Sequence, residues 1–342
     1  MSAFVKTCVG LIVGLACMGV VAHPPSATLS EGVQTIGLWP DGPPAGSGHA
    51  PTGDERVGRS GSGVGSVSNI GKPRIEIVRP AHPNGTAVLI IGGGGLFRIE
   101  IGHESRPTAQ WLAALGMTPV ILYYRLPADG WAPVAPYQDA QRAMRILRAR
   151  AAVLGIDPQR IGVIGFSSGG DIAGITATRF AHDFYAPVDA ADKLSSRPDF
   201  AGLVYPVTSM QASYDTTRTY RELAAQGDAR TAYTVQLHVT PQTPPTFIAH
   251  AEDDPIVNVG SSLALYDVLR KQHVPAELHV FERGGHGWGL GMPGTRVGNW
   301  PVLFAGWIAG HGFLPAAGTV GATAVPAPAA ATPAGDDNGD DN

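Results

Sequence analysis

The sequence contains little cysteine and little charge. Its 342 residues include two cysteines, Cys8 and Cys17, and 15% of the residues are charged. The 24 lysines and arginines and 28 aspartates and glutamates give a formal charge of −4, without a block of basic residues. This balance argues against nucleic acid or an anionic membrane surface as the main partner. A hydrophobic content of 44% also excludes disorder for most of the chain.

The N-terminus carries an apolar run typical of a secretory signal peptide. Lys6 precedes the run at 7–21, and Val20 and Ala22 occupy the small-residue positions before a cleavage site. We therefore predict a signal peptide over 1–22, export to the periplasm or the medium, and no stable membrane insertion after cleavage. The run is short for a membrane anchor, and lipid attachment at Cys17 is the weaker alternative. Cleavage would leave no cysteine, which excludes disulfides and a cysteine nucleophile.

Composition divides the rest of the chain into three parts. Residues 23–72 are rich in Gly, Pro and Ser and predict an irregular lead-in partly packed through Trp39, or alternatively a disordered linker. Residues 73–315 form the candidate catalytic domain. Residues 316–342 are rich in Ala and Pro, end in an acidic cluster, and predict a disordered tail.

Short apolar runs alternate with amphipathic segments between these ends. An apolar stripe predicts a helix over 139–155, and 259–272 and 299–309 are similar. Strands that alternate with helices indicate an α/β fold with a mostly parallel sheet covered on both faces. The polar segment 208–243 interrupts this alternation and predicts an excursion over the carboxyl edge of the sheet. The predicted buried strands are 87–91, 120–124, 161–165, 201–205, 246–250 and 277–281.

Ser167 is the candidate nucleophile. It lies in Gly165-Phe166-Ser167-Ser168-Gly169, which matches G-x-S-x-G directly between a predicted strand and a predicted helix over 171–180. This motif makes a sharp turn that exposes the serine hydroxyl at the edge of the sheet. A chain with 45 glycines matches the pattern easily by chance, but the flanking strand and helix favour the nucleophile over a helix-capping loop.

His286 and Asp254 are the candidate base and acid. A serine hydroxyl needs a base near neutral pH, and His286 lies between glycines on a loop after a predicted strand. Asp254 follows another strand; Asp253 is its rival, and Glu252 is a weaker one. The order Ser167, Asp254, His286 is the order of an α/β-hydrolase, which is therefore the predicted fold of 73–315. His279 and His273 are expected to have structural roles.

The glycine run at 92–95 predicts an oxyanion hole. It directly follows the strand over 87–91, and its backbone N–H groups can approach a ligand closely. We predict that the amides of Gly94, Gly95 and Ser168 bind the oxyanion. A phosphate-binding loop is excluded because neither G-K-[ST] nor G-x-G-x-x-G follows. No cofactor and no metal are predicted, and H-E-x-x-H is absent.

Several motifs together resemble the secreted bacterial α/β-hydrolases related to acetylxylan and other carbohydrate esterases, some of which carry xylanase labels. The resemblance spans about 36–310 and implies cofactor-free hydrolysis of acyl esters, acetyl above all, on oligosaccharides or small alcohols. It also implies a structural role for His103-Glu104. The motifs are Leu38-Trp39-Pro40, Gly93-Gly94-Gly95, His103-Glu104, Trp111-Leu112, Tyr124-Arg125-Leu126, Asp139-Ala140-Gln141-Arg142-Ala143, Gly165-Phe166-Ser167-Ser168-Gly169-Gly170, Pro244-Pro245-Thr246-Phe247 and Gly285-His286-Gly287.

Three departures from the family pattern leave the substrate open. Gly92 and Leu96 occupy the outer places of the glycine motif, and Ser168 and Asp171 stand where the family more often has Ala and His. An exopeptidase or small-amide hydrolase of the same fold is the first alternative. A glycosidase would need two facing carboxylates and is disfavoured, as is a non-catalytic binding protein.

Overall fold

The computed structural model describes residues 32–60, 63–224, 227–292 and 294–314. The predicted signal peptide and the predicted tail lie outside these residues and stay predictions. Within the described residues, no helix combines the length and the apolar character needed to cross a bilayer.

A mixed sheet forms the centre of the described fold. Eight strands run in the order β1-β4-β6-β5-β7-β8-β9-β10, and neighbours from β6 to β10 are parallel. Both β1 and β6 are antiparallel to β4. The strands are β1 (Val33–Gly37), β4 (Arg74–Val78), β5 (Ala87–Ile91), β6 (Thr118–Tyr123), β7 (Ile161–Phe166), β8 (Ala201–Val204), β9 (Thr246–Ala251) and β10 (Ala276–Phe281).

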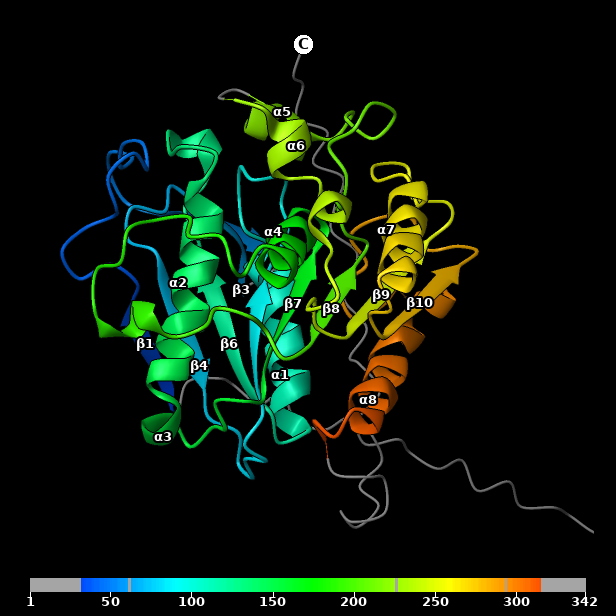
Figure 1. Cartoon of the computed structure of the whole chain (residues 1–342), viewed down its shortest axis with the longest axis horizontal. Coiled ribbons are helices and arrows are strands. Elements are labelled where there is room, and N and C mark those ends of the chain that lie inside the picture. The colour runs from blue at the N-terminus through cyan, green and yellow to red at the C-terminus, as the bar shows by residue number, and fades with distance from the viewer. Residues whose placement is uncertain (1–31, 61–62, 225–226, 293, 315–342) are drawn as a thin grey trace, which may run out of the picture.

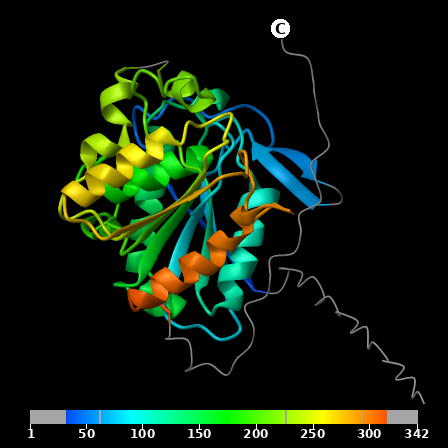
Figure 2. The ribbon, with the colours of Figure 1, turned by 90° about the vertical axis from the view of Figure 1, so that its right-hand side faces the viewer.

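Helices cover both faces of the sheet, as expected. Helices α2, α4 and α7 lie on one face, and α1 and α8 on the other (Figures 1 and 2). The short helices α5 and α6 lie above the upper ends of β7 and β8 in Figure 1, where the excursion was predicted. The bounds are α1 (Arg106–Ala114), α2 (Ala135–Ala149), α3 (Ala151–Leu154), α4 (Ser167–Thr178), α5 (Arg218–Ala224), α6 (Ala229–Ala232), α7 (Gly260–Lys271) and α8 (Trp300–Gly310).

The lead-in over 23–72 is only partly irregular in its described part: Trp39 packs into the core as expected, but the segment also contains strands that were not predicted. It contributes β1 to the central sheet and a two-stranded hairpin of β2 (Arg56–Ser60) and β3 (Gly63–Ser68). The hairpin stands apart from the central sheet (Figure 2). Only one of the five residues of β1 is buried, because an edge strand needs little apolar sequence. Composition alone therefore did not reveal these strands.

The helix predicted over 139–155 begins earlier and is divided. Helix α2 starts at Ala135 with a proline in its first turn, which is compatible with a helix start because no N–H partner is needed there. Arg150 separates it from the single turn of α3, and Gly155 ends that turn at a φ of +69°. The apolar stripe predicted the buried face but not the break.

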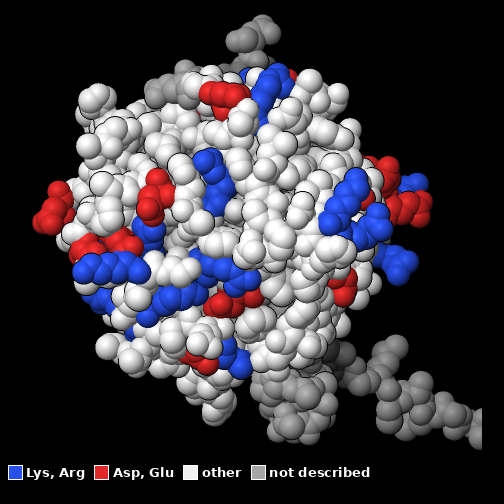
Figure 3. Space-filling view, in the orientation of Figure 1, with Lys and Arg blue, Asp and Glu red and all other residues white. Residues whose placement is uncertain are grey.

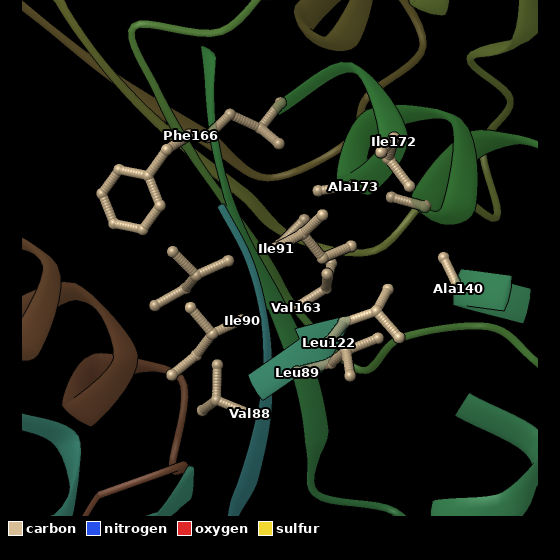
Figure 4. Close-up of a cluster of buried hydrophobic side chains, with 14 of the residues drawn as sticks. Val88, Leu89, Ile90, Ile91, Leu122, Ala140, Val163, Phe166, Ile172 and Ala173 are labelled. Atoms are coloured by element: carbon tan, nitrogen blue, oxygen red, sulfur yellow. The ribbon is translucent and has the colours of Figure 1, made fainter. Parts of the chain in front are cut away.

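The core lies between the sheet and its two helical layers. All five residues of β5 and all six of β7 are buried, as central parallel strands require. In Figure 4, Val88 and Ile90 lie on the same side of the sheet as the Phe166 ring of β7, whereas Leu89 and Ile91 lie on the other side with Ile172 and Ala173 of α4. This packing holds the carboxyl ends of β5 and β7 in fixed positions beneath the loops that follow them.

A buried ion pair between Arg125 and Asp139 joins the segment after β6 to α2. Asp139 accepts hydrogen bonds from Trp39 Nε1 (2.7 Å), the backbone N–H of Arg125 (2.8 Å) and Arg125 Nε (3.0 Å). Both charged side chains have no exposed area. These contacts fix the first turns of α2 against the sheet. The charged side chains visible in Figure 3 lie at the surface, where both signs are interleaved.

Replacing Asp139 by alanine should destabilise the protein by about 3–5 kcal/mol, because Arg125 would remain buried without a counter-charge. Asp267→Ala is the matched control, since Asp267 is 42% exposed in its pairs with Arg270 and Lys271; it should change stability by about 1 kcal/mol or less. Urea unfolding of both variants measures the difference, and equal losses would contradict this interpretation.

Candidate active site

Ser167 occupies a strained turn between β7 and α4. Its φ is +50°, in the left-handed region that residues with a side chain seldom adopt. A Cβ on Gly165 would overlap the carbonyl oxygen of Gly169, and one on Gly169 would overlap that of Ile91. The two glycines of the motif therefore allow the close strand-to-helix packing that turns the serine outward.

The structure brings the three predicted catalytic side chains together. His286 Nε2 lies 2.9 Å from Ser167 Oγ, and its Nδ1 lies 2.7 Å from Asp254 Oδ2. Gly285 and Gly287 adopt φ values of +60° and +71°, so the loop can fold back over the sheet edge. The three residues follow β7, β9 and β10, whose parallel carboxyl ends meet at one edge.

Asp254 is held by more donors than His286 alone. Its side chain is fully buried, and Oδ1 accepts the N–H groups of Ile256 and Val257 at 2.8 Å each. His250 Nε2 lies 3.1 Å from Oδ2. Burial opposes ionisation, but hydrogen bonds from His250 and His286 outweigh it and lower the pKa of Asp254. The carboxylate is therefore available to orient the imidazole.

Sequence reasoning did not single out His250. It is the penultimate residue of β9 and is fully buried, and its Nδ1 lies 2.8 Å from Ser262 Oγ on α7. A hydrogen bond donated by Ser262 to Nδ1 leaves Nε2–H to face Asp254 and the carbonyl of Val257. The only sequence signal was a polar residue within an apolar strand, four positions before Asp254.

The rival candidates have other positions. Asp253 Oδ1 accepts the N–H groups of Gly284 and Gly285 at 2.8 Å each, so Asp253 stabilises the loop that carries His286. Glu252 is exposed. His279 lies 2.6 Å from Glu277 on β10, and His273 lies in the turn before that strand. The geometry thus favours Asp254 as the partner of His286.

The predicted oxyanion amides differ in their availability. Gly95 N–H donates to Ser168 Oγ at 2.9 Å, so it is engaged within the protein. Among the described residues, the N–H groups of Gly94 and Ser168 have no protein acceptor. Gly93 approaches the nucleophile so closely that a Cβ would lie 2.8 Å from Ser167 Cβ. The glycine run therefore lies against Ser167, although one of its expected donors is occupied.

Glu104 connects the glycine run to the histidine loop, which sequence reasoning had not foreseen beyond a structural role. It is buried, with Oε2 accepting Gly93 N–H at 2.5 Å and Oε1 accepting the hydroxyl of Tyr205 at 2.8 Å. Tyr205 in turn accepts Gly289 N–H at 3.0 Å, and its ring lies edge-on 4.9 Å from His286. The adjacent His103 contacts the carbonyl of Gly287 at 2.5 Å.

This arrangement has the parts needed for nucleophilic acyl transfer. A serine hydroxyl meets a histidine that a buried carboxylate orients, and free backbone donors lie beside the serine. In the described part of the chain, no group of three or more His, Cys, Asp or Glu side chains is arranged to hold a metal ion. The expectation of a metal-free site stays a prediction.

Comparison with known proteins gives relatives with esterase and xylanase names. The profile of the BD-FAE family matches residues 75–269. The acetylxylan esterase of Xylanibacter ruminicola is 29% identical over 66% of this chain and 46% of its own length. The endo-1,4-beta-xylanase B of Butyrivibrio fibrisolvens is 31% identical over 66% of this chain and 34% of its own. The chain thus spans less than half the length of these two relatives.

Solved structures share the fold. The acetyl ester-xyloside bifunctional hydrolase from Caldicellulosiruptor lactoaceticus is 34% identical, with a TM-score of 0.66 over 71% of this chain and 89% of that chain. The propionate-bound esterase Est2 of Thermogutta terrifontis is 25% identical, with a TM-score of 0.63 over 78% of this chain and 96% of that chain. The predicted α/β-hydrolase fold is therefore confirmed.

The burial of Glu104 predicts a pH-dependent stability. Burial raises its pKa from 4.5 to about 8, against the opposing hydrogen bonds from Gly93 and Tyr205. As pH rises through this window, the unfolded chain loses a proton that the native state retains, so the free energy of unfolding falls. Wild type should therefore lose stability relative to Glu104→Gln between about pH 5 and pH 8. Urea titrations across this range measure the difference.

The control for this prediction is Glu282→Gln, because the Glu282 side chain is 91% exposed and does not contribute to the pKa of Glu104. Its stability difference from wild type should change little over the same pH range. A constant difference between wild type and Glu104→Gln would show that the Glu104 carboxyl titrates alike in the folded and unfolded chains.

Proposed function

Because the chain belongs to the BD-FAE family and shares its fold with esterases, we propose that it is a serine carboxylic-ester hydrolase. The observation that carries the proposal is the placement of His286 between Ser167 Oγ at 2.9 Å and Asp254 Oδ2 at 2.7 Å. Three residues distant in the sequence meet in the geometry that an activated serine requires.

In the proposed mechanism, Ser167 Oγ attacks the ester carbonyl while its proton passes to His286 Nε2. Asp254 accepts the Nδ1–H of His286, fixes the tautomer and stabilises the imidazolium that forms. The imidazolium then gives its proton to the departing alcohol, which leaves an acyl group on Ser167. Water, deprotonated by His286, then attacks this acyl-enzyme, and the imidazolium returns the proton to Ser167 Oγ as its bond to the acyl group breaks and the acid leaves.

The free N–H groups of Gly94 and Ser168 are the proposed donors to the oxyanion. Both lie next to the nucleophile and are unused by the described protein, which is the condition for a preorganised site. Gly95 contributes in this proposal once its N–H is released from Ser168 Oγ. A single such donor is worth about 2.7–4 kcal/mol of barrier.

The substrate proposed is an acyl ester, acetyl above all, of a carbohydrate or a small alcohol. Its support is the activity for which two relatives are named, an acetylxylan esterase and an acetyl ester-xyloside hydrolase. We also propose that the chain is exported after cleavage of residues 1–22. The proposed catalytic unit ends at residue 315. We extend the proposed unit back to Val33, because β1 pairs with β4 in the central sheet.

Ser167→Ala should lower kcat for p-nitrophenyl acetate by about 10⁴-fold or more while the fold survives. The variant lacks the nucleophile, so a fluorophosphonate probe should label wild type alone. The same preparations should be tested on a p-nitroanilide and on unacetylated xylan, where we expect no Ser167-dependent product. Full activity of the variant would refute the proposal, and faster anilide turnover would favour the amidase alternative.

Two neighbouring carboxylates allow a matched comparison. Asp254→Asn should lower kcat by about 10⁴-fold, because an amide no longer fixes the required histidine tautomer. Asp253→Asn should cost less than about fivefold, because asparagine keeps the oxygen that accepts Gly284 and Gly285 N–H. Steady-state kinetics on one ester measure both, and the reverse ranking would assign the acid to Asp253.

A further inference from the structure

Two arginines flank one aromatic ring beside the glycine run. The guanidinium of Arg218, the first residue of α5, lies 4.1 Å from the ring centroid of Phe97. The guanidinium of Arg98 lies 4.8 Å from the same centroid. Guanidinium groups stack favourably on aromatic faces, which holds them in defined orientations. We call Phe97, Arg98 and Arg218 the arginine platform.

The platform borders the proposed oxyanion site. A Cβ built on Gly95 would lie 3.2 Å from the Phe97 ring and 3.4 Å from Arg218 Cβ. The N–H group of Gly95 in turn donates a hydrogen bond to the hydroxyl of Ser168, the residue after the nucleophile. Arg218 comes from the excursion above the sheet edge and Arg98 from the loop after β5. The platform therefore contacts the same glycine run that lies against Ser167.

The arginines present unused donors to solvent. Glu100 accepts from Arg98 Nε at 2.5 Å, and Glu222 accepts from Arg218 Nε at 3.1 Å. Among the described residues, the terminal nitrogens of both arginines have no hydrogen-bond acceptor. The arginine side chains are 47% and 48% exposed, whereas their glutamates are 22% and 20% exposed. The two guanidinium groups therefore offer N–H donors that no described residue uses. The charges of the two arginines and of Glu100 and Glu222 sum to zero.

On this basis we propose that the arginine platform binds a carboxylate on the substrate, so that the preferred esters carry an acidic group such as that of an acidic sugar or a diacid. Terminal guanidinium nitrogens match the two oxygens of a carboxylate. This inference rests on the proposed esterase function. A group bound equally in ground and transition states lowers KM and leaves kcat unchanged.

The test uses two pairs of esters that differ in one charge. On the acyl side, p-nitrophenyl hydrogen succinate is compared with p-nitrophenyl methyl succinate. On the alcohol side, p-acetoxybenzoate is compared with p-acetoxybenzamide. Wild type should prefer the charged member of one pair by about tenfold in kcat/KM, mainly through KM, and the pair concerned identifies the side. High salt should reduce this preference.

The variant Arg98→Gln with Arg218→Gln should abolish the preference. Arg270→Gln is the matched control, because Arg270 is also exposed and paired with an aspartate, but lies on α7; it should keep the full preference. No preference in wild type, or one that survives in the double variant, would overturn the inference. Ser167→Ala separates the two proposals: Ser167-dependent hydrolysis without charge preference refutes the platform alone, whereas Ser167-independent hydrolysis refutes the esterase.

Discussion

The hydrogen bond between His286 Nδ1 and Asp254 Oδ2 is the interaction on which the proposed chemistry depends. At 2.7 Å this bond orients the imidazole so that its Nε2 edge faces Ser167, and it leaves Nε2 free to accept a proton. Several hydrogen bonds keep this carboxylate ionised although it is buried. They come from two backbone N–H groups and from His250, which is itself held by the hydroxyl of Ser262. The site is thus supported from α7 as well as from the strand edge.

A second network ties the two halves of the site together. Glu104 holds Gly93 on the oxyanion side and Tyr205 on the histidine side, while Tyr205 also receives Gly289 N–H. The Tyr205 ring packs against both His286 and Trp288. Because the buried Glu104 carboxyl contacts Gly93 directly and the histidine loop through Tyr205, displacement of either loop would leave polar groups without partners in the interior. The geometry of the site is therefore coupled to the packing beneath it.

The segments that we propose to face the substrate are more exposed than this buried centre. The excursion between β8 and β9 brings α5 over the glycine run, and its Arg218 stacks on Phe97 from the opposite loop. In the proposed function, the core strands position the catalytic residues, while side chains from less buried segments bind the substrate. The xylanase name of one relative does not bear on this region, because glycosidic cleavage needs a different pair of groups.

The sequence alone determined the fold class, the six central strands and the three candidate catalytic residues, because strand periodicity and the turn at Ser167 are local properties. It did not reveal β1, β4 and the β2–β3 hairpin, whose short and partly exposed strands need partners to be recognised. Only the tertiary structure decided between Asp253 and Asp254, since both follow the same strand and differ in which way they face. It also placed His250, Glu104 and Tyr205, whose partners lie far away in the chain and whose roles arise from packing.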